Sequence, residues 1–429
     1  MKVSFVSLGC DKNLCDSEHM LYLLEKEGFS FAEEPKDADI VVINTCCFIS
    51  DALEESIQTT IDYGKLKSEG QLKALILTGC MGQRFSEEIK KELPEVDAIV
   101  GTGSYDKIVS VIREVMVGKS VSLTEDIQNL PPMEGRKLSS FSASASLKIA
   151  EGCDKHCTYC VIPSVRGNYR SYPMEDILKE AQSLAENGIC ELNLVAQEVT
   201  VYGIDLYGQK MIVPLLQQLS EIEGIRWIRL LYCYPEEITD ELILEMKTNP
   251  KICHYIDMPI QHCSDRILGQ MGRKTKKDAI LTVIAKLRQS MPDIAIRTTL
   301  ICGFPGETEA EYEETRNMIL RVGFARIHVF PYSPREGTPA GQDIRGQGSP
   351  GESGANPFHR GEILVRMISA LHPLQDSIAT GLEGQVKLGA DLGHFLQTLA
   401  EVLRGHHGLQ GTQPDSLDPL DGMHRIFLR

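Results

Sequence analysis

Short apolar runs rich in β-branched residues recur along the first 340 residues, and each is followed by a helical pattern. In the first third of the chain these runs are KVSFVSLGC, ADIVVINTC, LKALILTGC and VDAIVG. Strands that alternate with helices predict a parallel sheet, and continuously apolar strands are typical of burial on both faces. We therefore expect an open parallel α/β domain over residues 1–125.

Three of these runs end in cysteine, at Cys10, Cys46 and Cys80, with spacings of 36 and 34 residues. Each spacing is about one strand–helix unit, so the thiols are predicted at the carboxyl ends of parallel strands, where open α/β sheets hold their ligands. One such cysteine is more often a small buried side chain. Three at equivalent positions favour an iron–sulfur site. Cys15, at a helix start, and Cys47, beside Cys46, are interpreted as non-ligands.

The rest of the α/β pattern forms a second series. Residues 126–144 contain paired Pro and many Ser, which is linker composition. About six further strand–helix units cover residues 145–340, beginning with SLKIA. They predict a partial (β/α) TIM-like barrel with its chemistry on the loops that follow the strands.

The loop after the first of these strands, EGCDKHCTYC, holds Cys153, Cys157 and Cys160. Structural zinc is disfavoured, because it usually takes four protein ligands in paired spacing. Cubane iron–sulfur clusters take cysteine thiolates, and three protein ligands leave one iron free for an outside ligand. His156, inside this loop, is interpreted as a solvent-facing residue and not a ligand.

Cys-x3-Cys-x2-Cys, with Tyr159 before the last cysteine, resembles the signature of the radical S-adenosylmethionine (SAM) superfamily. LGCDKNLCDSE, INTCCFISDA and TGCMGQR resemble the N-terminal domain of the methylthiotransferases, and EGCDKHCTYCVIPSVRGNYRS resembles their central domain. The resemblance covers roughly residues 1–340. It implies that the second cysteine set holds the 4Fe–4S cluster that binds and cleaves SAM. The first set, Cys10, Cys46 and Cys80, would hold an auxiliary 4Fe–4S cluster.

AQEVTVYGID, RLLYCYPEEI and FPYSPREGTPA are more similar to the branch that modifies an aspartate of small-subunit ribosomal protein twelve than to the tRNA branch. Asp11 is a departure, since that branch usually has Pro there. The resemblance implies methylthio addition to the aspartate β-carbon, with a basic ribosomal protein and an electron donor as partners. The alternatives are a tRNA adenosine methylthiotransferase, with tRNA as partner, and a non-catalytic iron–sulfur electron-transfer or scaffold protein.

No catalytic acid or base is assigned, but several residues are predicted to contact SAM. LICGFPGE follows a strand, and its glycines let the backbone approach a ligand, although a tight turn explains them equally well. Polar groups at strand ends would add further contacts, with an arginine on the SAM carboxylate. The set is Tyr159, Gln197, Glu198, Arg297, Gly303 and Gly306. RKTKK, from Arg273, is interpreted as a solvated helix face.

The composition changes at residue 341. Residues 341–429 contain 14 of the 36 glycines and 6 of the 11 histidines, but Lys387 is their one lysine. This atypical tail is predicted to be loop or disordered. It stands where the family normally has a small β-barrel, the TRAM domain. A shifted reading frame near residue 341 would explain the change, as would an unrelated domain.

Charge and cysteine content restrict the partners and the cellular compartment that the protein can have. A formal charge of −16 argues against general nucleic-acid binding and suits a basic protein partner. No run approaches the ~20 apolar residues of a membrane helix, and MKVSFVSLGC lacks the features of a signal peptide. Thirteen cysteines are typical of metal binding or catalysis in a reducing compartment. We therefore expect a cytoplasmic protein with no membrane partner.

Overall fold

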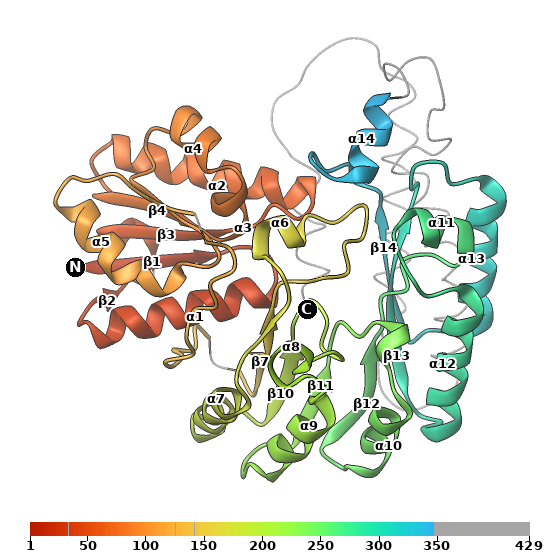
Figure 1. The fold of residues 1–429 in the computed structure, drawn as a ribbon. Helices are drawn as coiled ribbons and strands as arrows, with labels where there is room; N and C mark the ends of the chain where they lie inside the picture. Colours follow the sequence, from red (N-terminus) through yellow and green to blue (C-terminus); the bar gives the residue numbers. More distant parts are fainter. Residues whose placement is uncertain (33, 125, 141, 347–429) are drawn as a thin grey trace, which may run out of the picture. The chain divides into compact units, whose positions relative to one another are not determined.

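The computed structural model describes residues 1–346 except 33, 125 and 141 (Figure 1). These residues all belong to one of the two compact units of the chain, Met1–Leu371. The stretch beyond residue 346, with the predicted loop or frame-shifted sequence, lies outside the described residues. No helix in the described part is long and apolar enough to cross a membrane.

The first sheet is parallel throughout, with the strand order β2-β1-β3-β4-β5-β6, which confirms the predicted open α/β domain. Its strands are β1 (Lys2–Ser7), β2 (Ser30–Phe31), β3 (Ile40–Thr45), β4 (Ala74–Thr78), β5 (Ala98–Val100) and β6 (Val121–Leu123). Its α-helices are α1 (Asp11–Lys26), α2 (Ser50–Ser68), α3 (Gly79–Arg84), α4 (Ser86–Glu92) and α5 (Ile108–Met116). The sequence did not predict β2 and β6, which have two and three residues.

Helices cover both faces of this sheet (Figure 1). Ile40 and Val42 of β3 pack with apolar residues of α1 and α5. Val41 and Ile43, which point the other way, pack with residues of α2, α3 and α4. Successive strand residues face opposite sides, so covering both sides requires an apolar residue at every position.

The second sheet is also parallel, with the order β14-β13-β12-β11-β10-β7 and two free edges, which confirms the partial barrel. Its strands are β7 (Ser144–Lys148), β10 (Glu191–Val195), β11 (Trp227–Leu230), β12 (Ile252–Asp257), β13 (Ala295–Cys302) and β14 (Arg326–Pro331). Two short strands, β8 (Ala150–Glu151) and β9 (Arg170–Ser171), pair antiparallel beside it.

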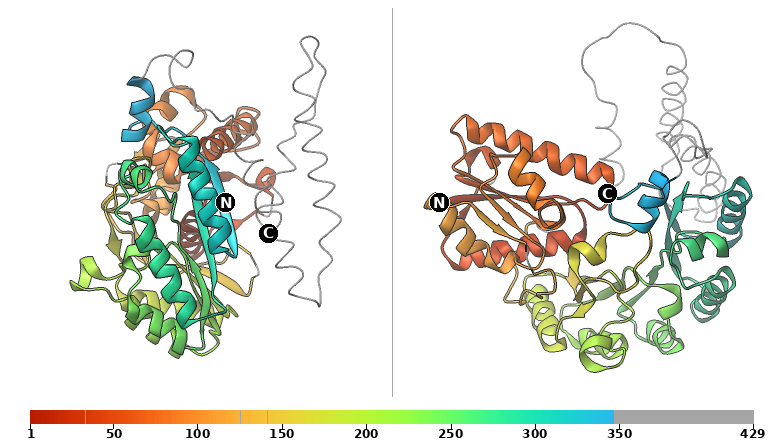
Figure 2. Two further views of the ribbon diagram at one scale, coloured as in Figure 1. Left: turned by 90° about the vertical axis from the view of Figure 1, so that its right-hand side faces the viewer. Right: turned by 45° about the horizontal axis from the view of Figure 1, so that its top comes forward.

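The helices of this second half lie along the outer side of its sheet (Figure 2). The longer ones are α7 (Met174–Glu186), α9 (Ile212–Glu221), α10 (Asp240–Thr248), α12 (Lys277–Ser290) and α13 (Glu309–Val322). The others are α6 (Ile162–Arg166), α8 (Ile204–Tyr207), α11 (Asp265–Gln270) and α14 (Pro339–Gly346). Alternate strand residues such as Leu192, Ile228 and Ile296 pack under these helices in one apolar core.

The face of the second sheet that points away from these helices is polar. Asn193 of β10 stands beside Arg229 of β11, and Asp257 of β12 stands beside Arg297 of β13. A closed barrel fills its interior with branched apolar side chains. This inner face carries charges and amides instead, so it is suited to line a polar ligand.

Residues 126–144 were expected as a linker. Leaving out residue 141, the part before β7 contains no helix or strand, but it packs closely against the rest of the protein. Leu130, Met133 and Leu138 lie on the core of the second sheet. Arg136 is 3% exposed and forms ion pairs with Glu18 of α1 at 2.6 Å and Glu180 of α7 at 3.2 Å. The segment therefore holds the two halves together and is not a free spacer.

Candidate functional site

The first cysteine set lies where the strand pattern predicts it, on three neighbouring strands. Cys10 directly precedes α1, Cys46 follows β3, and Cys80 lies in the first turn of α3 after β4. Gly9 brings the first two together: a Cβ atom at Gly9 would lie 2.9 Å from Cys46 Cβ, and its φ is +95°. Both the close contact and the left-handed backbone require glycine here.

Burial shapes the chemistry of these thiols. Cys46 and Cys80 are 7% and 6% exposed. Burial raises the pKa of the Cys80 thiol, the Arg166 guanidinium lowers it, and the nearby Cys46, Cys47 and Cys10 thiols raise it again. A metal is needed to hold them as thiolates together.

The second set occupies the loop after β8. The backbone N–H of Lys155 donates to Cys153 Sγ at 3.5 Å, and that of Ile162 donates to Cys160 Sγ at 3.4 Å. Burial raises the pKa of Cys153 to about 11 and that of Cys160 to about 12. Hydrogen bonds to sulfur are one means by which proteins hold and tune iron–sulfur clusters.

Each cysteine set supplies the donor type that an iron–sulfur cluster takes. Within residues 1–346, leaving out the three gaps, no group of three or more His, Cys, Asp or Glu side chains is placed to hold a single metal ion. A cubane of irons and bridging sulfides separates its cysteine ligands more widely than one ion does. Three thiols per set, with backbone N–H groups on the sulfurs of the second, are the donors that such a cluster takes.

Two thiols and one imidazole near these sites, those of Cys15, Cys47 and His156, are interpreted as non-ligands. The buried Cys15 thiol donates to Ser146 O of β7 at 3.5 Å. Cys47 is buried, and burial raises its pKa to about 11. His156 is exposed, with a left-handed φ of 51°. Their interpretation as non-ligands stays a prediction.

Gln197 and Glu198, predicted to contact SAM, follow β10 at the mouth of the partial barrel. Both polar side-chain atoms of Gln197 are buried, and in the described part of the chain neither has a hydrogen-bond partner. Glu198 is 1% exposed, accepts a hydrogen bond from the Thr200 backbone N–H at 3.1 Å, and leaves Oε2 without a partner there. Burial raises the pKa of Glu198 to about 7, although Thr200 and Lys155 lower it.

The other predicted SAM contacts are differently placed. Tyr159 is buried against Phe304, with ring centroids 6.4 Å apart. Arg297 lies on the inner face of β13, with Nη1 2.7 Å from Asp257 Oδ2. Gly303 and Gly306 form the turn after β13, with φ of 73° and 77°, and the Gly303 N–H donates to Glu307 Oε2 at 2.5 Å. Their contact with SAM stays a prediction.

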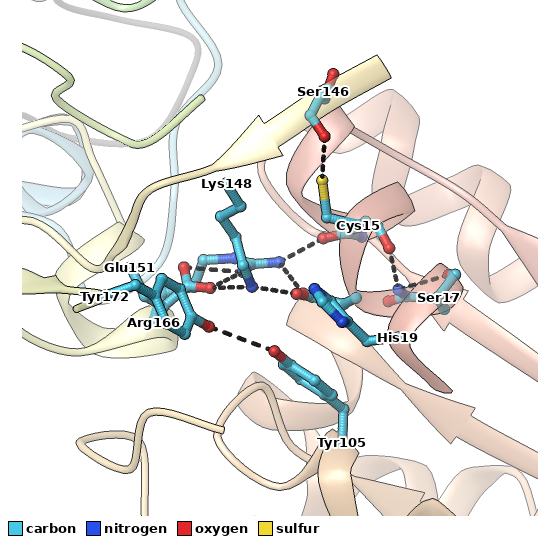
Figure 3. Close-up of polar contacts among 12 residues, drawn as sticks. Cys15, Ser17, His19, Tyr105, Ser146, Lys148, Glu151, Arg166 and Tyr172 are labelled. Atoms are coloured by element: carbon cyan, nitrogen blue, oxygen red, sulfur yellow. Dashed lines mark hydrogen bonds and ion pairs between the residues drawn. The ribbon is translucent and has the colours of Figure 1, made fainter. Parts of the chain in front are cut away.

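A buried group of charges that the sequence did not reveal joins the two halves (Figure 3). The Arg166 Nη1 group donates to both Glu151 oxygens at 2.9 Å, and Nη2 donates to Asn13 Oδ1 at 2.5 Å and lies 3.2 Å from Asp16 Oδ2. Lys148 pairs with Asp16 and, at 2.9 Å, with Glu151 Oε2. We call these five residues the domain-joining network.

Charge balance explains how this network is tolerated inside the protein. Its four charged side chains are 0–4% exposed, and its two cations match its two carboxylates. Burial alone would raise the pKa of Glu151, but Arg166 and Lys148 hold it below its ordinary range. Lys148 also lies 5.1 Å from the centre of the Tyr105 ring. The one sequence signal was Arg166, which follows Cys160 within the same motif.

The loops at the carboxyl ends of the barrel strands hold three non-glycine residues with left-handed φ. They are His156 at 51°, Tyr232 at 58° and Gln261 at 68°. Each such residue costs about 1–3 kcal/mol, and such strain gathers at functional sites. All three lie at the edge where a barrel of this type binds its ligands.

Arg273, interpreted as part of a solvated helix face, is buried instead. It is 7% exposed, lies 4.1 Å from the centre of the Tyr234 ring, and donates to Pro259 O at 2.7 Å. Tyr234 in turn places its hydroxyl 3.7 Å from Cys157 Sγ. The interpretation was wrong for this residue, because α12 begins only at Lys277 and the preceding segment turns inward.

Comparisons with known proteins agree with this arrangement. Residues 2–101 match the family described as Uncharacterized protein family UPF0004, and residues 147–319 match the Radical SAM superfamily. The chain is 54% identical over 341 residues to the ribosomal protein uS12 methylthiotransferase RimO of Lachnoclostridium phytofermentans, covering 79% of this chain and 78% of that protein. It is 48% identical over 345 residues to the RimO of Clostridioides difficile, covering 79% and 77%.

Solved structures share the fold at low sequence identity. The radical SAM methyltransferase TsrM from Kitasatospora setae aligns with a TM-score of 0.58 at 12% identity, over 81% of this chain and 78% of that one. The radical SAM enzyme OxsB aligns with a TM-score of 0.54 at 14% identity, over 74% and 51%. With two matched domains and 54% identity to a RimO over most of both chains, this chain belongs to the RimO-type radical SAM methylthiotransferases.

Proposed function

We propose that this chain adds a methylthio group to the β-carbon of an aspartate in ribosomal protein uS12, using SAM and two 4Fe–4S clusters. The observation that carries the proposal is the pairing of two three-cysteine sets, one at the edge of each parallel sheet. The name of the RimO relatives supports the choice of substrate.

The bond to be changed explains why such an apparatus is needed. A β-carbon–hydrogen bond next to an ionised carboxylate is only weakly acidic, so a radical is a suitable means of breaking it. When bound, the cluster at Cys153, Cys157 and Cys160 supplies the electron that cleaves SAM, and the cofactors carry this chemistry.

The residues of the chain bind and orient. The Lys155 and Ile162 backbone N–H groups fix two sulfurs of the second set. Gln197, with its unpaired buried amide, and Glu198 are the polar groups offered to SAM beside that loop. Cys10, Cys46 and Cys80 would hold the auxiliary cluster, and the domain-joining network would fix the position of one set relative to the other.

Charge supports a protein substrate. At −16 the chain repels a polyanion such as tRNA and attracts a basic ribosomal protein. All thirteen cysteines are free thiols, as in a reducing compartment. We infer that the protein works in the cytoplasm and receives its electrons from a separate donor.

Anaerobic reconstitution tests the proposal. We expect about eight irons per chain, four for each cluster, and 5′-deoxyadenosine on addition of SAM and a reductant. Replacing Cys153, Cys157 and Cys160 together with alanine should halve the iron and abolish SAM cleavage. Replacing Cys190, which lies outside both sets, should change neither.

Mass spectrometry after incubation with uS12 and with tRNA then identifies the substrate. A methylthio group on a uS12 aspartate is the expected result. Methylthio groups found only on tRNA nucleosides would assign the chain to the other branch. Bound iron without any 5′-deoxyadenosine would make it an electron-transfer or scaffold protein.

A further inference from the structure

Lys12 is a buried ammonium group without a carboxylate partner. It is 5% exposed, and within the described residues it forms no ion pair. Its Nζ donates to Ala196 O at 3.4 Å and lies 3.8 Å from the centre of the Tyr232 ring. Lys148, equally buried, has two carboxylates. An uncompensated buried charge costs several kcal/mol, so its retention points to an anion that completes the site.

The position of Lys12 links the two cysteine sets. It stands two residues after Cys10, in the first turn of α1. Its side chain reaches the opposite domain at the loops after β10 and β11, where Ala196 and Tyr232 lie. The ammonium is thus at the mouth of the partial barrel, on the side nearest the first cysteine set.

The groups around this ammonium are polar and incompletely paired. Asp257 is 1% exposed; its Oδ2 accepts from the Tyr232 N–H at 3.3 Å and pairs with Arg297, while its Oδ1 has no hydrogen-bond partner in the part of the chain described. Gln197 follows Ala196 directly, with both amide atoms buried and equally unpaired there. Buried polar groups are rarely left unsatisfied, and such exceptions mark ligand sites.

The backbone holds Tyr232 in place for this contact. Its left-handed φ of 58° is strained for a residue with a side chain. That conformation turns the aromatic face under the ammonium, and a cation is attracted to such a face. The strained backbone at Tyr232 and the contact of its ring with Lys12 thus occur at the same residue.

We propose that Lys12 binds the carboxylate of the target aspartate and so turns the adjacent β-carbon towards the first cysteine set. This inference rests on the proposed function. The carboxylate carbon is bonded directly to the β-carbon, so fixing the first limits the position of the second. A neutral nucleobase of tRNA in the same place would leave the ammonium without an anionic partner. Lys12 would therefore be a residue that determines specificity for the aspartate.

A double-mutant cycle between Lys12 and the substrate tests this. The full chain, reconstituted anaerobically, is given a uS12 loop peptide with its target aspartate, or with asparagine there. Peptide affinity is measured by calorimetry with SAM and without reductant, and kcat/KM is measured with reductant. In the unmutated chain we expect asparagine to lower both about 10- to 100-fold, the range for a hydrogen bond to a charged group.

Lys12→Met should lower the affinity for the aspartate peptide by a similar factor and remove the difference between the two peptides. Lys12→Arg, which keeps the charge, should preserve part of that difference. Iron content and SAM cleavage without peptide are measured in both variants, and Lys26→Met should leave both unchanged. Lys26→Met is the matched control, because Lys26 lies on the same helix in an exposed pair with Glu134.

Three results would overturn the inference. The first is an unmutated chain that binds both peptides equally. The second is a Lys12→Met variant that keeps the aspartate preference. The third is loss of iron or of SAM cleavage without peptide, which would place the ammonium on a cofactor. If the unmutated chain yields no methylthio product, the proposed function fails; if it does, and the preference persists in Lys12→Met, only this inference fails.

Discussion

Replacing Arg166 with methionine removes one of the two cations of the domain-joining network and keeps most of the side-chain volume. Glu151 and Asp16 would then share Lys148 alone, and Asn13 Oδ1 would lose its Arg166 donor and keep only the Cys80 thiol. The whole group is at most 4% exposed, so water cannot replace the lost partner.

The magnitude follows from this geometry. Removing one partner from a buried ion pair costs about 3–5 kcal/mol, because a carboxylate stays buried without compensation. Total stabilities are about 5–15 kcal/mol, so the variant loses a large fraction of its free energy of unfolding. Adding Glu151→Gln restores neutrality, and we expect the double variant to recover more than about 1 kcal/mol of the loss.

Urea unfolding of the apoprotein at neutral pH, followed by far-UV circular dichroism, measures these differences. Arg113→Met is the control, because Arg113 pairs with Glu27 at the surface, where the two side chains are 59% and 42% exposed. That pair should be worth about 0–1 kcal/mol. If Arg166→Met costs no more than Arg113→Met, the network does not stabilise the fold and the reasoning is refuted.

Three further predictions concern single residues. Burial raises the Glu198 pKa to about 7, so the stability that this side chain contributes is complete below its ordinary pKa and is lost as pH rises towards 7. Relative to the Glu198→Gln variant, the apoprotein should lose about 3 kcal/mol of its free energy of unfolding over that pH range. Parallel pH profiles of stability for the two proteins would contradict this. Gly9→Ala should lower the amount of iron bound to the first cysteine set. Gly28 also has a positive φ, but no atom lies within 4 Å of a Cβ built there, so Gly28→Ala should bind iron normally. Equal iron in the two variants would show that the contact between Gly9 and Cys46 is unimportant. Arg273→Lys loses the planar stack on Tyr234 and should cost about 1–2 kcal/mol in urea unfolding; a change below about 0.5 kcal/mol would mean that the stack is not important.

The strand–helix rhythm and the position of the cysteines could be predicted because both are local. An apolar strand can be recognised from a few residues. Parallel topology then places the residues that follow the strands at the same edge of the sheet. The domain-joining network could not be predicted, since Asp16 and Lys148 are 132 residues apart in the chain. The first half of α1, DKNLCDSE, is a polar run that looks exposed until the other domain covers it.

The linker and Lys12 were missed for a related reason. Pro and Ser predict an irregular path for residues 126–144, and the path is irregular, but composition does not show that Arg136 would be buried between α1 and α7. Lys12 sits inside the motif that suggested the first cysteine set, beside Cys10. Its role depends on the Tyr232 ring, which comes from a loop 220 positions further along the sequence.

The domain-joining network also determines how the protein can be divided. Asn13 and Asp16 follow Cys10 closely, while Glu151 and Arg166 stand on either side of the loop that contains Cys153, Cys157 and Cys160. Cutting the chain between the halves would separate Asp16 from Lys148 and Arg166, and these two cations would keep Glu151 as the one network carboxylate on their side of the cut. Neither half is therefore a self-sufficient fragment. A shortened chain used to study one cysteine set therefore has to keep both halves, because the buried charges beside each set find their partners in the other half.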